Sequence, residues 1–181
     1  MIHSAFELFR EFGVSGTGLR DINAHSGVAR GAIYHHFPGG KDELAAAAAT
    51  YAGDQIRALL ETVAMTADPI TTVRAFVAAW EDHVIAHEFR AGCTIVAVAN
   101  EAASGSTVAE AASQAFDGWV SVLATCLQRE GISRERAERL GSMIVSAVEG
   151  AVILSRVRGT TGPLKDVGSE LEAILAGVLD R

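Results

Sequence analysis

The chain has 181 residues, of which 49% are hydrophobic and only three are proline, and its formal net charge is −7. This length allows one or two domains with a sizeable core, and the composition favours a helical protein. No apolar run reaches the ~18 residues that a membrane-spanning helix needs, and no basic segment precedes an apolar stretch at the start, so we expect neither a membrane anchor nor a signal peptide. The two cysteines, Cys93 and Cys126, are expected to be reduced core residues of a cytoplasmic protein.

Basic and acidic side chains are unevenly distributed along the chain. Residues 1–41 carry four basic and three acidic side chains, whereas the remaining residues carry eleven basic and nineteen acidic ones. Four of the six histidines also lie in the first 41 residues. The N-terminal segment is therefore much less acidic than the rest, but it is not strongly basic, so we expect a modest and weakly salt-dependent affinity for nucleic acid in general.

The N-terminal segment shows the pattern of a helix-turn-helix. Apolar spacing predicts a first helix over residues 1–12, ended by Gly13. Two further helical patterns, each about two turns long, flank Ser26-Gly27-Val28, and Thr17 stands where the N-cap of the first of them is expected. Helices this short are unstable alone, and two of them joined by a tight glycine-containing turn are typical of a motif that places its second helix in the DNA major groove.

Helical patterns with short connections continue through the rest of the chain. We expect helices over residues 41–65, 69–87, 93–103, 107–130, 133–158 and 164–180. No strand pattern and no internal repeat is present in the sequence. The sequence therefore predicts an all-α protein with an N-terminal three-helix head, residues 1–45, and a C-terminal helical bundle, residues 46–181.

Particular residues of the head match a family pattern. They are Phe12-Gly13, Thr17, Arg20-Asp21-Ile22, Ser26-Gly27-Val28, Gly31, Ile33-Tyr34-His35-His36-Phe37, Lys41 and Leu44. Over residues 3–45 this pattern resembles the TetR family of bacterial transcriptional repressors. The Phe-Pro-Gly-Gly-Lys run that follows, together with Gly92-Cys93 and Glu149-Gly150-Ala151, is similar to the LmrA/YxaF-like branch of that family. The resemblance implies a DNA-binding domain over residues 1–45 and a ligand-binding and dimerisation domain over residues 46–181.

The resemblance also implies that the head binds a double-stranded DNA operator through the major groove. The family positions that hold phosphates correspond to Thr17, Tyr34, His35 and Lys41. The positions that face bases correspond to Arg20, Arg30, Gly31 and Ala32. This division fits the chemistry, because arginine can make a bidentate contact to guanine whereas lysine serves phosphate. The alternative for each arginine is a solvated surface charge.

An aromatic stripe in the C-terminal bundle indicates a pocket for a small molecule. Phe76, Trp80, His83 and His87 share one helix face, and further aromatic residues line the next long helix. We expect an apolar or aromatic effector to contact Phe76, Trp80, His83, His87, Cys93, Phe116, Trp119, Met143 and Glu149. The alternative is an ordinary hydrophobic core with two exposed histidines. For Glu149, the alternative to ligand contact is a structural pair with His83 or His87 across helices.

Apolar residues on the last two helices predict a homodimer. The helix over residues 133–158 is apolar on more than one side, and the final helix carries one apolar stripe. A helix with two apolar faces needs two neighbours, and helix pairs from two chains can form a four-helix interface about a two-fold axis. The predicted interface residues are Ile144, Val148, Val152, Leu164, Val167, Leu171, Ile174, Leu175 and Val178. The operator would then be a near-palindrome with half-sites about one helical turn apart.

Catalytic and metal-binding chemistry have little support in the sequence. It holds no nucleophile elbow, phosphate-binding loop or metal-binding motif. His83 and His87 are spaced like two metal ligands on a helix, but no third ligand stands at a telling offset. We therefore expect neither an enzyme nor a bound metal or cofactor.

A second class of function stays open at this point. The weak positive charge of the head, and a first helix that begins later than is usual in the family, would also fit a helical small-molecule-binding protein that has lost DNA binding. Only the regulator would retard operator DNA in a mobility-shift assay.

Arg30→Ala and Lys41→Ala are expected to weaken DNA binding in different ways. Loss of Arg30, the predicted guanine contact, should cost about 1–3 kcal/mol on the operator and relax the base preference. Loss of Lys41, the predicted phosphate contact, should weaken binding to all sequences alike. Mobility shifts on operator and randomised DNA at several salt concentrations measure both effects. If Arg30→Ala weakened every sequence equally, its assignment to base reading would be wrong.

Overall fold

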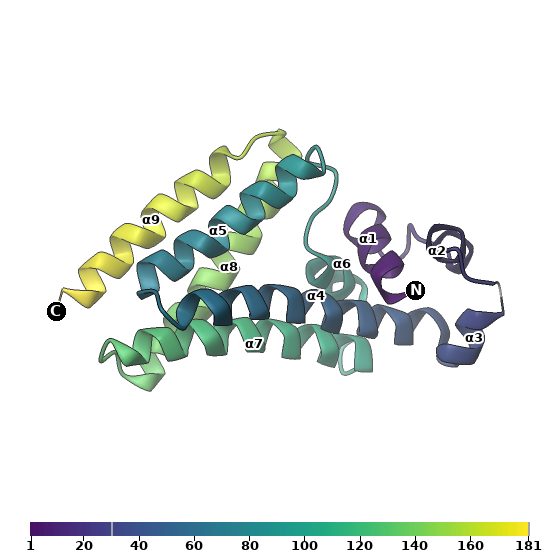
Figure 1. Cartoon of the computed structure of the whole chain (residues 1–181), viewed down its shortest axis with the longest axis horizontal. Helices are drawn as coiled ribbons and strands as arrows, with labels where there is room; N and C mark the ends of the chain where they lie inside the picture. Colours follow the sequence, from purple (N-terminus) through teal and green to yellow (C-terminus); the bar gives the residue numbers. More distant parts are fainter. Residues whose placement is uncertain (30, 181) are drawn as a thin grey trace. The chain divides into compact units, whose positions relative to one another are not determined.

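The computed structural model describes residues 1–29 and 31–180. These residues form nine helices and no strand (Figure 1), so the predicted all-α fold is confirmed. The N-terminal helices are α1 (Ile2–Phe12), α2 (Leu19–Ser26), α3 (Ala32–His36) and α4 (Gly40–Ala64). The others are α5 (Pro69–Ala86), α6 (Thr94–Glu101), α7 (Thr107–Arg129), α8 (Arg134–Arg158) and α9 (Gly162–Leu179).

Local sequence signals account for most of the helix ends. The carboxylate of Asp68 accepts a hydrogen bond from the amide of Thr71 at 2.9 Å and so caps α5, and this bond holds the pKa of Asp68 below its usual value. The start of α9 differs from the prediction. Pro163 lies inside its first turn and not in the preceding loop, because the missing amide hydrogen of proline costs nothing there.

The chain folds into two compact units that share two of the long helices. The first unit contains Met1–Asp54 and Gly92–Phe116, and the second contains Gln55–Ala91 and the described residues from Asp117 onward. The boundary therefore falls inside α4 and inside α7. The unit that contains the predicted head is larger than residues 1–45, because it extends to Asp54 and also includes α6 and the start of α7. The functional boundary after residue 45 stays a prediction.

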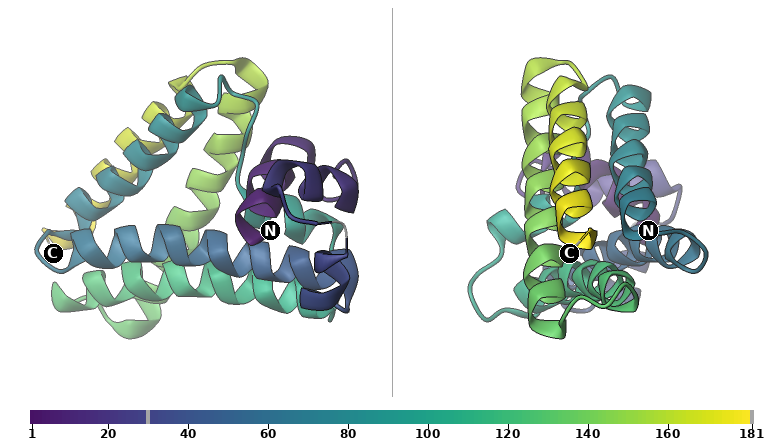
Figure 2. Two further views of the ribbon diagram at one scale, coloured as in Figure 1. Left: turned by 45° about the vertical axis from the view of Figure 1, so that its right-hand side comes forward. Right: turned by 90° about the vertical axis from the view of Figure 1, so that its left-hand side faces the viewer.

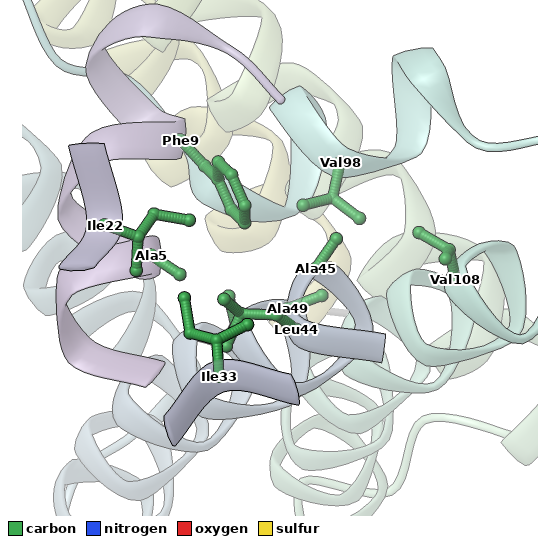
Figure 3. Close-up of a cluster of buried hydrophobic side chains, with 10 residues drawn as sticks. Ala5, Phe9, Ile22, Ile33, Leu44, Ala45, Ala49, Val98 and Val108 are labelled. Carbon is green, nitrogen blue, oxygen red and sulfur yellow. The ribbon is translucent and has the colours of Figure 1, made fainter. Parts of the chain in front are cut away.

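The core of the first unit is a cluster of apolar side chains from α1, α2, α3, α4 and α6, together with the start of α7. Its buried members are Ala5, Phe9, Ile22, Ile33, Leu44, Ala45, Ala48, Ala49, Val98 and Val108. Figure 3 shows Ile22 and Ile33 pointing inward from α2 and α3, and Phe9 lying near Val98 of α6. These contacts fix α2 and α3 on a common base, which neither short helix could supply alone.

In the second unit, α9 packs against both α5 and α8 (Figure 2). The side chains of Leu164, Leu171 and Leu175 on α9 are 3% exposed or less. Helices α7 and α8 approach closely at Gly141, where an added Cβ would lie 2.9 Å from the carbonyl oxygen of Val120. The apolar stripe predicted on the last helix is therefore the face that closes the core of its own chain.

Helix α8 is long and apolar enough, by length and composition alone, to cross a membrane. Half of its most apolar 18-residue stretch is buried inside the protein. Nine of its residues are buried, including Ile144, Val148 and Val152. This composition is what the central helix of a helical core needs, and we interpret α8 in that way.

Leu171→Ala is expected to lower the free energy of unfolding by about 2–5 kcal/mol, because it leaves a cavity between α9 and its neighbours. Urea unfolding followed by circular dichroism at a fixed protein concentration measures the change. Ile85→Ala is the control, since Ile85 is 56% exposed, and it should change the free energy by less than about 1 kcal/mol. Equal losses in the two variants would contradict the assignment of Leu171 to the core.

Candidate DNA-binding surface and ligand-binding region

Short local hydrogen bonds build the turn between α2 and α3. Helix α2 ends at Gly27, whose φ of 68° is a left-handed conformation that strains residues with a side chain. The amide of Val28 donates to the hydroxyl of Ser26 at 3.4 Å, and the amide of Ala32 donates to the carbonyl of Ala29 at 2.9 Å. The predicted helix-turn-helix is therefore present.

The outward faces of α2 and α3 are polar. Ile22 and Ile33 are fully buried, whereas Arg20, Tyr34 and His35 are exposed, Tyr34 by 66%. This face offers a guanidinium group, a phenol and imidazole nitrogens. Such groups can donate hydrogen bonds to phosphate oxygens and base edges.

The other positions predicted to contact DNA differ in their surroundings. Gly31 is exposed, and a Cβ added there would meet no atom within 4 Å. Ala32 and Lys41 are half-buried. Arg30 lies outside the residues that the structure describes. DNA contacts at all of these positions stay predictions.

Thr17 is buried and is not the N-cap of α2, which corrects the expectation from the sequence. It is 2% exposed, and its hydroxyl donates to the carbonyl of Gly13 at 2.8 Å. The N-cap is Gly18, whose amide donates to the carboxylate of Asp21 at 2.8 Å. An acid three residues after the cap position was the overlooked signal. A phosphate contact from Thr17 stays a prediction, with its hydroxyl already used inside the unit.

The aromatic residues predicted to line a pocket form one connected cluster in the second unit. The distance between ring centroids is 5.7 Å from Trp119 to Phe76 and 6.4 Å from Trp119 to Trp80. Trp80 meets His83 edge-on at 5.3 Å, and His83 lies 4.5 Å from His87. Phe76, Trp80 and Trp119 are at most 5% exposed. Helices α5 and α7 thus bring five of the predicted ligand-binding residues together.

The cluster also contains individual buried polar atoms. The indole N–H of Trp80 has no hydrogen-bond partner among the described residues. The ring Nδ1 of His87 lies 2.8 Å from the carbonyl oxygen of His83, at the end of α5. Glu149 on α8 is 6% exposed, and its place beside a ligand stays a prediction. Burial of polar groups beside aromatic rings is typical of small-molecule sites, where a few such groups orient the ligand.

The remaining residues of the predicted pocket lie elsewhere. Cys93 and Phe116 belong to the first unit, in which Cys93 is buried at the start of α6. Met143 is 38% exposed on α8. Ligand contacts at these positions stay predictions. Among the described residues, no group of three His, Cys, Asp or Glu side chains is placed to hold a metal ion. The pair His83 and His87 therefore has no third such side chain beside it in the described part of the chain.

The second unit also has a groove that the sequence did not reveal. It measures about 360 Å³ and lies between the end of α4 and the second half of α7. Its lining residues are Glu61, Ala64, Met65, Ser121, Val122, Thr125 and Arg129. The guanidinium of Arg129 donates to the carbonyl of Ala64 beside it. These residues form no periodic or chemical motif, because they come from two helix segments far apart in the chain.

The predicted dimer interface stays a prediction, and most of its residues are packed inside their own chain. Seven of its nine residues are at most 8% exposed within one chain, and only Val167 and Ile174 are partly or largely accessible. The seven are Ile144, Val148, Val152, Leu164, Leu171, Leu175 and Val178. A side chain already packed inside its own chain offers no surface to a second copy. The exposed apolar residues of α8 are instead Met143, Ile153, Leu154 and Val157.

Two protein families match the chain. Residues 1–48 match the family described as bacterial regulatory proteins, tetR family, and residues 69–170 match the C-terminal domain of LmrA/YxaF-like transcriptional regulators. An uncharacterised HTH-type transcriptional regulator of Mycobacterium tuberculosis is 34% identical over 99% of this chain and 94% of its own length. The HTH-type transcriptional regulator LmrA of Bacillus subtilis is 29% identical over 97% of this chain and 94% of its own length.

Solved structures show the same fold over nearly the whole chain. A TetR transcriptional regulator from Legionella pneumophila superposes with a TM-score of 0.85 at 22% identity, covering 96% of this chain and 94% of the other. A TetR transcriptional regulator from Chloroflexus aurantiacus gives a TM-score of 0.75 at 28% identity, covering 97% and 91%.

Proposed function

Because this chain belongs to the TetR family of helix-turn-helix DNA-binding transcriptional regulators, with a C-terminal domain of the LmrA/YxaF-like type, we propose that it is a repressor released from its operator by a small molecule. The family is a non-enzymatic one. The observation that carries the proposal is a polar, exposed outer face on α2 and α3 over a buried apolar inner face. A repressor of this kind acts in the bacterial cytoplasm, where its operator is.

Operator reading is assigned to the outer face of the helix-turn-helix. Arg20, Arg30, Gly31 and Ala32 would face base edges, because arginine can pair with guanine and small residues allow close approach of the helix backbone. Thr17, Tyr34, His35 and Lys41 would hold phosphates and fix the register. The exposure of Arg20, Tyr34 and His35 supports this assignment.

The effector is an apolar or aromatic molecule that carries a hydrogen-bond acceptor. The cluster of Phe76, Trp80 and Trp119 supplies flat apolar surface, and the indole N–H of Trp80 supplies a donor whose burial is costly until an acceptor reaches it. His83, His87 and Glu149 would orient the polar end of the molecule.

Release from DNA would be a shift between two populations of the same protein. Helix α4 contributes to both compact units, so a tilt of this helix would change the separation of the two heads of a dimer. To weaken DNA binding about a hundredfold, the effector must prefer the released state by roughly 2.7 kcal/mol.

The homodimer would use the outer face of α8. Met143, Gly150, Leu154 and Val157 follow one another at intervals of seven, four and three residues, which places them on one stripe of the helix. Leu154 is 46% and Val157 81% exposed. Ile174 on α9 is 42% exposed and would extend the stripe. The two apolar sides of α8 then have different partners, its own chain and a second copy.

A mobility shift with the DNA upstream of the coding region tests the repressor proposal. Retardation at low salt is expected, on a near-palindrome with half-sites about one helical turn apart. Absence of any shift with a folded protein would contradict it and favour the alternative of a ligand-binding protein without DNA binding.

The effector is found by a fluorescence screen of apolar compounds, because Trp80 and Trp119 are the two tryptophans of the chain. A compound that binds the cluster should quench their emission and weaken operator binding about a hundredfold at saturation. Compounds that quench and leave DNA affinity unchanged would support the pocket and contradict the switch. Folded Trp80→Ala and Trp119→Ala variants that respond with unchanged potency would place the pocket elsewhere.

The double variant Leu154→Glu, Val157→Glu is expected to be a folded monomer by light scattering at micromolar concentration. Two carboxylates on the apolar stripe would have to be buried without partners in the dimer. Ile85→Glu, on an exposed position of α5, is the matched control and should leave the dimer intact. A dimer that survives both carboxylates would show that another surface joins the copies.

A further inference from the structure

Hydrogen bonds join α6 and the residue segment before it to α1 within the first unit. In the sequence, α6 lies far beyond the helix-turn-helix. The amide of Gly92 donates to the carbonyl of Arg10 at 2.8 Å, and the hydroxyl of Thr94 donates to the carbonyl of Phe6 at 3.0 Å. Val98 lies in the core cluster of this unit (Figure 3). A helix that the sequence assigns to the C-terminal bundle is thus part of the base on which the helix-turn-helix rests.

The carboxylate of Glu101, at the end of α6, holds the backbone that follows α1. The amide of Val14 donates to its Oε1 at 2.9 Å, and the amide of Ser15 donates to its Oε2 at 2.7 Å. The hydroxyl of Ser15 also donates to Oε2. A Cβ added at Gly13 would lie 3.0 Å from Oε1, so the carboxylate lies close against this turn. One side chain of α6 therefore accepts three hydrogen bonds from two successive residues.

These bonds involve a charged acceptor. The pKa of Glu101 is held below its usual value, first by the hydrogen bond from the hydroxyl of Ser15. The hydrogen bonds from the backbone amides of Ser15 and Val14 and the nearby charge of Lys41 act in the same direction, and burial opposes them. Glu101 is therefore ionised at neutral pH. Hydrogen bonds to an ionised group are about twice as strong as neutral ones.

The backbone held by Glu101 leads directly into α2. The amide of Thr17 donates to the carbonyl of Val14 at 3.2 Å, and the hydroxyl of Thr17 donates to the carbonyl of Gly13. The N-cap of α2 follows at Gly18. The turn is one tight hydrogen-bonded loop, so a shift of Val14 or Ser15 would move the start of α2.

We propose that Glu101 is a positioning residue for operator binding, which from outside the helix-turn-helix fixes the turn between α1 and α2 and so the placement of the DNA-reading face. The inference rests on the proposed binding to an operator. It predicts a change in DNA affinity opposite in sign to the change that the loss of a negative charge alone would cause. Removing a negative charge from a DNA-binding unit should strengthen DNA binding through charge alone, whereas loss of positioning should weaken it.

The test measures operator affinity of the full-length protein by fluorescence anisotropy with a labelled operator duplex. Glu101→Ala should bind at least tenfold more weakly than the wild type, and Glu101→Gln should lose less because it keeps one acceptor oxygen. Glu110→Gln is the matched control. Glu110 is exposed in the first turn of α7, in the same unit, so its neutralisation should leave the affinity unchanged or slightly raised.

A mutant cycle with Ser15→Ala separates positioning from general destabilisation. Ser15→Ala removes one of the three donors, and its effect on operator affinity should be much smaller in the Glu101→Ala background than in the wild type. Melting temperature and light scattering confirm that each variant is folded and keeps its oligomeric state. If Glu101→Ala does not fold, Glu101→Gln and Ser15→Ala complete the same comparison.

The outcomes distinguish this inference from the proposed function. A wild-type protein that does not bind operator DNA contradicts the repressor proposal. A wild-type protein that binds, with folded Glu101 variants that bind equally well or better, overturns the role of Glu101 alone. An equal loss in Glu110→Gln would also overturn it, because the effect would then belong to charge and not to position.

Discussion

A helix of eight residues and a helix of five cannot keep their shape in water without packing partners, and α2 and α3 are such helices. The first unit supplies that packing through Phe9, Ile22 and Ile33, which are fully buried. The contribution of α6 matters because Val98 completes the cluster from a distant part of the chain. The accuracy with which the polar face meets DNA therefore depends on apolar contacts behind it. Weaker packing in this core would let α2 and α3 shift, and would lower the discrimination between bases before the whole unit unfolded.

In the second unit, helix α8 carries apolar residues on two sides. The inner side of α8 packs on α5 and α9 of its own chain, while Leu154 and Val157 stay exposed on the outer side. The buried aromatic cluster of α5 and α7 gives the unit an apolar interior that also holds a polar group. The indole N–H of Trp80 costs stability in an apolar interior, because no described residue accepts a hydrogen bond from it. Such a cost is typical of residues kept for binding, and it is the physical basis of the effector proposal.

The sequence could predict what depends on neighbouring residues and could not predict what depends on distant ones. The start of α5 at Pro69 and the glycine turn after α2 are local, and both predictions are confirmed. Thr17 was misassigned as a cap because the N-cap is the next residue, Gly18, whose amide donates to the carboxylate of Asp21 three residues later. The burial of most predicted dimer residues inside their own chain was not foreseen, because both sides of α8 are apolar and periodicity does not say which side faces inward. Glu101 was missed entirely, since nothing near it in the sequence points to Ser15, 86 residues away.

The few fixed charges of the head have a consequence for how such a protein would be distributed in a cell. With four basic and three acidic side chains in its first 41 residues, the head gains little from displacing counterions on arbitrary DNA. The chromosome offers millions of competing sites, roughly 10⁶–10⁹ in the usual estimate, and it retains a protein of this kind only weakly. Most copies would then not be bound to non-specific DNA. The occupancy of the operator would follow the concentration of free protein. A small number of copies would then suffice, because few would be lost to the rest of the genome.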